Sequence, residues 1–192
     1  MADRFKQALR HTYQQIRQSL SPTYQSQSSL QICKQISKLD CYRYAKRIAL
    51  YRAVNGEVDL EKIWISAPLQ GKYCYFPALN DDKTLSFLPA TPSSRFCKNR
   101  YGILEPDVSR EEAILPSLLD VMFIPLVSFD SSGTRLGMGA GYYDRTLALS
   151  RASVLIGVAF EFQHQTFIEK QHWDIPMNLV ITESTVYSCN GA

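Results

Sequence analysis

The chain has 192 residues, a length typical of one domain with a sizeable hydrophobic core. Hydrophobic residues make up 45% and charged residues 20%, close to the globular average, which excludes extensive disorder. No apolar run approaches the ~20 residues that a membrane helix needs, and no apolar signal segment follows Met1. We therefore expect one domain over residues 1–192, located in the cytoplasm and without a membrane partner.

The net charge of +3 is distributed unevenly along the chain. Residues 1–56 contain ten lysines and arginines and two acidic residues, a net charge of +8, so the remainder carries −5. A basic N-terminal part indicates a partner with several negative charges, such as a nucleic acid, a nucleoside triphosphate or a polycarboxylate.

The first predicted element is a helix over Ala2–Leu20. Its apolar residues recur at helical spacing: Phe5, Leu9, Tyr13, Ile16 and Leu20. Lys6, Arg10 and Arg17 form a basic stripe beside them, for which a solvated flank is the simplest interpretation.

Helices and strands are then expected to alternate. After Pro22, a second helix runs to about Leu39, followed by a strand at Arg47–Arg52 and a helix near Leu60–Ala67. Strands are predicted at Lys72–Phe76, Thr84–Leu88, Asp120–Phe129, Val154–Phe160 and Leu179–Thr182, with a helix at Tyr142–Ser150 and a long connection at Ser93–Pro106. This alternation predicts an α/β layered fold with a mostly parallel sheet.

Cysteine and histidine spacing gives no indication of a metal site. The five cysteines lie far apart without a C-x-x-C pair, and the three histidines have no ligand spacing. Reduced, mostly buried thiols are expected.

The most informative segment surrounds three alternating glycines, Gly137, Gly139 and Gly141, between a strong strand and a predicted helix. Alternating glycines let a backbone approach a ligand closely, and a helix N-terminus offers unpaired N–H groups to phosphate. Arg135 precedes the loop and can pair with phosphate oxygens. Asp144, in the first helical turn, can cap the helix or hold Mg²⁺.

Two other phosphate-binding patterns fit less well. The Walker pattern is absent, and the dinucleotide fingerprint needs a third glycine where this chain has Tyr142. Glu161 nevertheless stands where a ribose-binding acid would follow, so a nicotinamide-dependent oxidoreductase stays open. A nucleic-acid binder stays open because of the basic N-terminal part, although no recognition motif occurs.

Five segments together resemble the 5-formyltetrahydrofolate cyclo-ligase family, also called methenyltetrahydrofolate synthetases. The most specific is the block R-L-G-x-G-x-G-Y-Y-D-R, which begins at Arg135. The others are Lys6–Arg10, Asn55–Asp59, Tyr101–Pro106, and Trp173–Pro176 with Val180–Glu183. Their order and spacing cover almost the whole chain.

The resemblance implies an ATP- and Mg²⁺-dependent enzyme that converts 5-formyltetrahydrofolate to 5,10-methenyltetrahydrofolate, with ADP and phosphate as products. It also implies a three-layer α/β/α sandwich of the type shared with ribose-phosphate isomerases and coenzyme A transferases. We expect a monomer whose partners are folate and ATP rather than nucleic acid.

The resemblance also implies site residues. ATP would be bound by Lys6, Gln7, Ala8, Leu9, Arg10, Arg135, Leu136, Gly137, Met138, Gly139, Ala140, Gly141, Tyr142 and Tyr143. Folate would be bound by Arg52, Glu57, Met138, Gly139, Ala140, Gly141 and Tyr142, with Glu57 on the pterin. The metal would be held by Asp144 and Asp174.

One departure from the family pattern concerns the loop itself. Some members carry basic side chains at the positions of Met138 and Ala140, which are uncharged here. More of the phosphate binding is then expected from backbone N–H groups, Lys6, Arg10 and Arg135. Tyr101, Tyr142, Tyr143 and Trp173 are candidates for stacking on the pterin or adenine.

Overall fold

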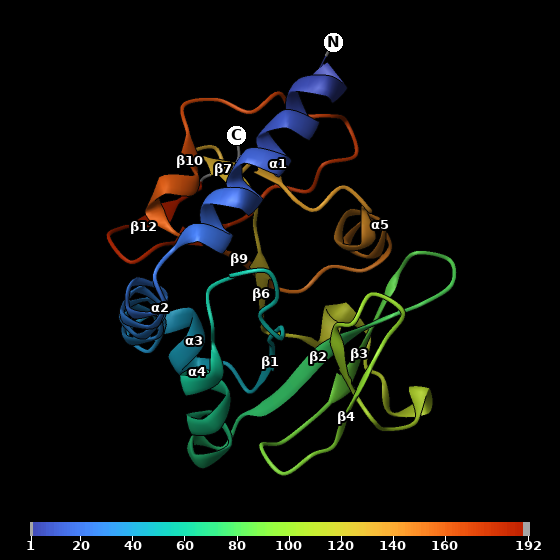
Figure 1. The fold of residues 1–192 in the computed structure, drawn as a ribbon. Helices are drawn as coiled ribbons and strands as arrows, with labels where there is room; N and C mark the ends of the chain where they lie inside the picture. Colours follow the sequence, from blue (N-terminus) through green and yellow to red (C-terminus); the bar gives the residue numbers. More distant parts are fainter. Residues whose placement is uncertain (1, 190–192) are drawn as a thin grey trace.

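The computed structural model describes residues 2–189, and the side chains of residues 4–189. Its centre is a seven-stranded sheet with the order β12–β11–β9–β6–β1–β2–β3 (Figure 1). The strands are β1 (Arg47–Ala49), β2 (Tyr73–Leu79), β3 (Leu85–Pro89), β6 (Val121–Pro125), β9 (Val154–Val158), β11 (Leu179–Ile181) and β12 (Val186–Ser188). Strands β2, β1, β6, β9 and β11 run parallel, and the two edge strands are antiparallel to their neighbours.

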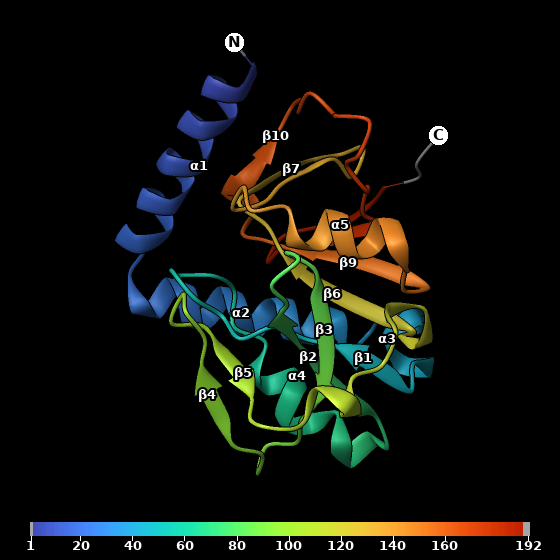
Figure 2. The same ribbon diagram turned by 90° about the vertical axis from the view of Figure 1, so that its right-hand side faces the viewer.

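Helices cover both faces of this sheet, which confirms the predicted α/β fold with a mostly parallel sheet. Helices α2 (Pro22–Ile36), α3 (Asp40–Tyr44) and α4 (Glu61–Ser66) pack on one face through a core that includes Ile32, Tyr42 and Ile63. Helix α5 (Tyr142–Leu149) packs on the other face through Leu147. The views in Figures 1 and 2 place α5 across the sheet from α2.

Helix α1 (Ala2–Ser19) lies beside the sheet, as Figure 2 shows. Its Leu9 and Tyr13 pack against a small cluster formed by Val127, Leu136 and Ile168, while Phe5 stays 62% exposed. The predicted basic stripe is only partly solvated. Arg17 is 1% exposed, so the interpretation of the whole stripe as a solvated flank is wrong.

The predicted strand 120–129 is two strands that belong to different sheets. Strand β6 ends at Pro125, which lacks a backbone N–H, and the chain then turns into β7 (Ser128–Asp130). Strand β7 pairs with β8 (Arg135–Leu136) and β10 (His164–Gln165) in a three-stranded sheet. The β7–β8 hairpin leads directly into the glycine loop at residues 137–141.

The predicted connection 93–106 contains a hairpin that the sequence pattern did not reveal. Strands β4 (Phe96–Lys98) and β5 (Leu104–Pro106) pair antiparallel. The side chain of Asn99 accepts hydrogen bonds from the N–H groups of Tyr101 and Ile103, which stabilises the turn. Short 3₁₀ helices complete the chain: Pro68–Gln70, Arg110–Glu112, Pro116–Leu118 and Glu161–Gln163.

The sequence also led us to expect no membrane helix and reduced, mostly buried cysteines. Among the residues that the structure describes, no helix is long and apolar enough to cross a membrane. All five cysteines are free; Cys33, Cys74 and Cys189 are buried, and Cys97 is exposed.

Candidate active site

A cavity of about 1230 Å³ opens at the carboxyl ends of β1, β2 and β6. Tyr51 and Arg52 follow β1, residues 125–127 end β6, and Pro77 and Leu79 lie in β2. From β1 the chain continues to β2 on one side, and it returns later as β6 on the other. Ligands of parallel sheets bind at such a reversal point, so the topology itself indicates the site.

The cavity brings together most of the residues that the sequence analysis singled out. It is lined by Lys6, Arg10, Arg52, Glu57, residues 135–144, Tyr101, Trp173 and Asp174. Gln7, Ala8 and Leu9 do not line it. Lys6 and Arg10 are four residues apart and share one helical face, so the three residues between them point elsewhere. Gln7 and Ala8 are exposed, and Leu9 packs on the small cluster.

The glycine loop presents its N–H groups without acceptors. Gly139 (φ 99°) and Gly141 (φ 71°) adopt positive φ angles, which other residues rarely do. Within residues 2–189, no hydrogen bond is donated by the N–H groups of residues 137–141. The loop carbonyls, by contrast, are occupied: Arg10 Nε donates to Gly137 O over 2.9 Å, and Arg145 donates to Ala140 O. Because α5 begins at Tyr142, the N–H groups and the helix dipole favour an anion here.

The two predicted metal ligands lie in the cavity wall and already have partners. Asp144 accepts a hydrogen bond from Arg135 Nη2 over 2.6 Å, and Arg135 also donates to Ile175 O. Asp174 lies 3.9 Å from Lys6 Nζ. Among the described residues, no group of three or more His, Cys, Asp or Glu could hold a metal ion. Mg²⁺ is commonly held by one or two carboxylates plus substrate phosphates, so this donor set fits Mg²⁺ bound together with a nucleotide.

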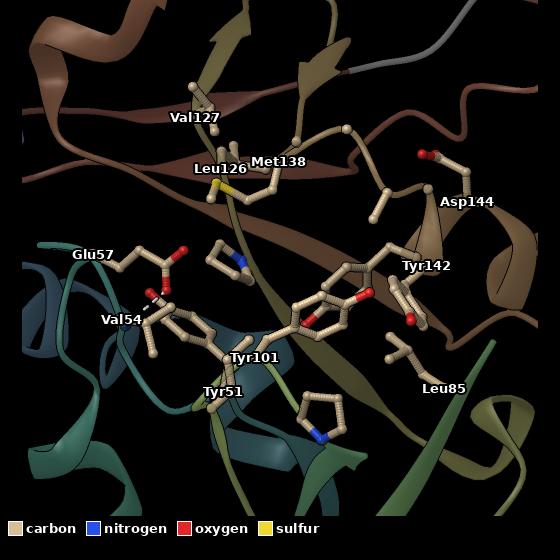
Figure 3. A pocket seen from close by; sticks show the side chains of 18 of the residues that line it. Tyr51, Val54, Glu57, Leu85, Tyr101, Leu126, Val127, Met138, Tyr142 and Asp144 are labelled. Carbon is tan, nitrogen blue, oxygen red and sulfur yellow. Dashed lines mark hydrogen bonds between the residues drawn. The ribbon is translucent and has the colours of Figure 1, made fainter. Parts of the chain in front are cut away.

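A buried carboxylate, Glu57, lies across the cavity from Asp144 (Figure 3). Its side chain is 6% exposed, and Oε2 accepts a hydrogen bond from Val54 N over 3.1 Å. Burial raises the pKa of Glu57 to about 7, and the positive charge of Arg17 opposes this rise. Burial and the charge of Glu57 together raise the pKa of both Tyr51 and Tyr143. Glu57 can therefore gain or lose its charge near neutral pH, while both tyrosines stay neutral.

The sequence analysis missed the apolar part of the cavity wall. This part includes Tyr51, Val54, Pro77, Leu79, Leu85, Leu126 and Val127. Most of these residues end or follow parallel strands, and that position was the available signal. A contact from the unpredicted hairpin was missed as well: Arg100 donates to the hydroxyl of Tyr142 over 3.0 Å, which lowers the pKa of Tyr142.

The structure removes the basis of the oxidoreductase alternative and weakens that of the nucleic-acid binder. The carboxylate of Glu161 accepts hydrogen bonds from the hydroxyls of Thr182 and Tyr187, and Glu161 does not line the cavity. It therefore anchors the C-terminal strands rather than forming a ribose site. The basic stripe of α1 is directed inward, with Lys6 and Arg10 at the cavity and Arg17 buried.

The fold and this site define an α/β protein whose glycine loop is suited to an anionic ligand. The sequence model of the 5-formyltetrahydrofolate cyclo-ligase family matches residues 2–183. The chain belongs to the 5-formyltetrahydrofolate cyclo-ligase family, which confirms the resemblance found in the sequence.

Individual relatives agree with the family model. The chain is 34% identical to 5-formyltetrahydrofolate cyclo-ligase of Haemophilus influenzae over 90% of this chain and 94% of the relative. It is 33% identical to the Escherichia coli K12 enzyme of the same name, over 90% of this chain and 97% of that relative. The solved structure of Aquifex aeolicus 5,10-methenyltetrahydrofolate synthetase matches with a TM-score of 0.85 and 30% identity, covering 97% of this chain and 94% of that chain.

Proposed function

We propose that the cavity converts 5-formyltetrahydrofolate to 5,10-methenyltetrahydrofolate with consumption of ATP. The observation that carries the proposal is that one cavity contains both hydrogen-bond donors for an anion and a carboxylate that accepts hydrogen bonds. Unpaired N–H groups of residues 137–141 lie beside Arg10, and a buried carboxylate, Glu57, faces them. The first region suits a triphosphate and the second suits the N–H donors of a pterin. Family membership supports the same reaction.

The chemistry needs positioning more than a protein nucleophile. The formyl oxygen attacks the γ-phosphorus of ATP, so an O–P bond forms and the bond to ADP breaks. N10 of the folate then attacks the activated carbon, and the C–O bond breaks as phosphate leaves. N10 loses its proton, and the product is the methenyl bridge between N5 and N10. An enzyme accelerates this sequence by aligning both substrates and stabilising charge on the transferring phosphoryl group.

The residues divide this work between them. The loop N–H groups, Lys6 and Arg10 would bind the phosphates, and Glu57 would accept hydrogen bonds from the pterin. Met138 and Tyr142 border the space between these regions in Figure 3, so they would contact folate next to the nucleotide. Arg52, whose guanidinium lies 4.7 Å from the centre of the Trp64 ring, would contact the substrate from the far wall.

Mg²⁺ would be held by Asp144 and Asp174 together with the nucleotide phosphates. When bound, it would neutralise charge on the phosphate oxygens. Arg135 donates to Asp144 over 2.6 Å, so we assign Arg135 to the support of this carboxylate. A direct contact from Arg135 to phosphate would require that ion pair to open, and it stays a prediction.

The proposal is tested by mixing the purified chain with ATP, Mg²⁺ and 5-formyltetrahydrofolate and following the absorbance of the methenyl product. We expect product only when ATP is present, and one ADP per methenyl group. Folded protein that gives a flat trace would refute the proposal.

We also propose a monomeric enzyme, with residues 1–192 acting as one unit in the cytoplasm and without nucleic acid as a partner. One chain supplies lining residues from Lys6 to Asp174, so the cavity needs no second copy. Free cysteines at five positions suit a reducing compartment. Light scattering would test the monomer.

A further inference from the structure

Arg17 is a buried arginine that the proposed chemistry does not use. It lies on α1, with 1% of its surface exposed. Its Nη1 donates to the carbonyl of Leu126 over 3.2 Å, and the same nitrogen lies 3.9 Å from Glu57 Oε1. Its Nε and Nη2 are buried without a hydrogen-bond partner. A buried guanidinium is costly, so its burial here indicates a specific role.

The backbone fixes Arg17 against the turn that carries Glu57. Gly56 has a φ of 72°, and a Cβ atom there would lie 2.8 Å from the carbonyl oxygen of Arg17. Only a glycine therefore lets this turn approach α1 so closely. The contact places the side chain of Arg17 behind Glu57, with Leu126 at the end of β6 as its anchor.

We propose that Arg17 is the positioning residue for Glu57: it holds the carboxylate toward the cavity for folate binding. This inference rests on the proposed function, because it concerns the pterin-binding carboxylate of the same cavity.

The electrostatic surroundings of Glu57 support this role. Four groups face it: Arg17 from α1, Val54 N from its own turn, Tyr51 from the segment after β1 and Tyr143 from α5. The two tyrosines are neutral because burial and the charge of Glu57 raise their pKa. Arg17 is the cation that opposes the effect of burial and lowers the pKa of Glu57. Without Arg17 the pKa of Glu57 would rise further, so a smaller fraction of the carboxyl would be ionised at neutral pH and able to act as an acceptor only.

Helix α1 also carries Lys6 and Arg10, which are proposed to bind ATP, so the role of Arg17 can be distinguished from theirs. Lys6 and Arg10 lie at the glycine-loop region, and Arg17 lies about two turns further along α1. A change at Arg17 should therefore affect the use of folate and leave the use of ATP nearly unchanged. Changes at Lys6 or Arg10 should do the reverse.

The test compares Arg17→Gln, Arg17→Met and Arg17→Lys with the wild-type chain. Arg17→Met keeps an apolar stem of similar length and removes the buried unpaired donors, so it retains the fold if Arg17→Gln does not. In wild type, kcat/KM for folate should fall as the pH is lowered, and we call this fall the acidic limb of the pH profile. The apparent pKa of this limb should rise by about one unit in Arg17→Gln and Arg17→Met. At pH 7 about half of Glu57 is ionised when its pKa is about 7. A rise of one unit leaves about a tenth ionised, so the KM for folate should rise about fivefold, with the KM for ATP within about twofold of wild type. Arg17→Lys should return the limb toward the wild-type position.

Arg4→Gln is the matched control, because Arg4 is an exposed cation on the same helix and does not line the cavity. It should leave both KM values and the pH profile unchanged. In a Glu57→Gln background, Arg17→Met should have no further effect on the KM for folate, since its effect acts through Glu57. Two results would overturn the inference. One is a folded Arg17→Met enzyme whose acidic limb has the wild-type apparent pKa. The other is an Arg17→Met substitution that raises the KM for folate equally with and without Glu57→Gln.

A carbon-13 NMR titration of the Glu57 carboxyl separates this inference from the proposed function. An inactive wild-type enzyme would refute the proposed function. The titration would still show whether replacing Arg17 raises the pKa of Glu57, and an unchanged pKa would refute the role of Arg17.

Discussion

The two ends of the cavity carry opposite kinds of polar group. At the glycine loop, the donors are backbone N–H groups of residues 137–141, with Lys6 and Arg10 beside them. At the other end, one buried carboxylate, Glu57, lies 3.9 Å from the buried guanidinium of Arg17, which lowers the pKa of Glu57. Backbone donors do not depend on side-chain identity, so the loop can carry the uncharged Met138 and Ala140 and still suit an anion. The Glu57 end has no such tolerance.

The largest effect is expected from Glu57→Gln, which removes the negative charge at the Glu57 end of the cavity. Hydrogen bonds to a charged group contribute about 1.5–3 kcal/mol, so kcat/KM for folate at pH 8 should fall about 100-fold. The KM for ATP should change little. The wild-type value should itself fall below pH 7, because protonation removes the charge of a group whose pKa is about 7. A variant that retains this acidic limb would show that another group titrates.

Asp144→Asn tests the metal assignment at the loop end. The amide keeps an oxygen for Arg135, so the fold should survive while one anionic ligand is lost. Calorimetry should show the affinity for Mg-ATP reduced about 30-fold, within the range typical of such losses. Asp107→Asn, an exposed acid that does not line the cavity, is the control. Equal Mg-ATP affinity in the two variants would remove Asp144 from the metal site.

Lys6→Ala and Arg10→Ala should raise the KM for ATP about tenfold each, since a charge-assisted phosphate contact contributes about 1.5 kcal/mol or more. The KM for folate should rise less. Arg4→Ala removes the same charge from the same helix but lies outside the cavity wall. If Arg4→Ala raised the KM for ATP as much, the effect would come from the general basic charge of α1.

The smallest effect is expected from the loop glycines and concerns stability. Gly139→Ala places a side chain at a φ of 99°, with its Cβ 3.4 Å from the guanidinium of Arg10. Strain of this kind costs about 1–2 kcal/mol, which denaturant unfolding would detect. Gly137→Ala is the control, because Gly137 lacks a positive φ and its Cβ would meet nothing within 4 Å. Equal unfolding free energies would mean that the loop relaxes without loss.

Local signals predicted some parts of the molecule well and others poorly. Helix α2 begins at Pro22, where the sequence analysis expected a new helix. The hydroxyl of Ser21, the residue before it, accepts a hydrogen bond from Tyr24 N and caps the helix. The apolar run 154–160 became β9, a strand covered on both faces. The hairpin 96–106 was missed because each of its strands has only three residues, too few for a hydrophobic alternation to be recognised. The run 120–129 was predicted as one strand because its apolar residues continue past Pro125 into a second sheet.

The sequence by itself determined the layered fold, the family and the glycine loop, because these depend on short-range spacing and on the order of segments along the chain. Only the tertiary structure decided that Lys6 and Arg10 face the loop while Gln7 and Ala8 face solvent. It also decided that Arg17 is buried behind Glu57, a contact between residues 40 positions apart. Burial and charge pairing are properties of the packed chain, and they set the pKa of Glu57, which spacing along the sequence does not encode.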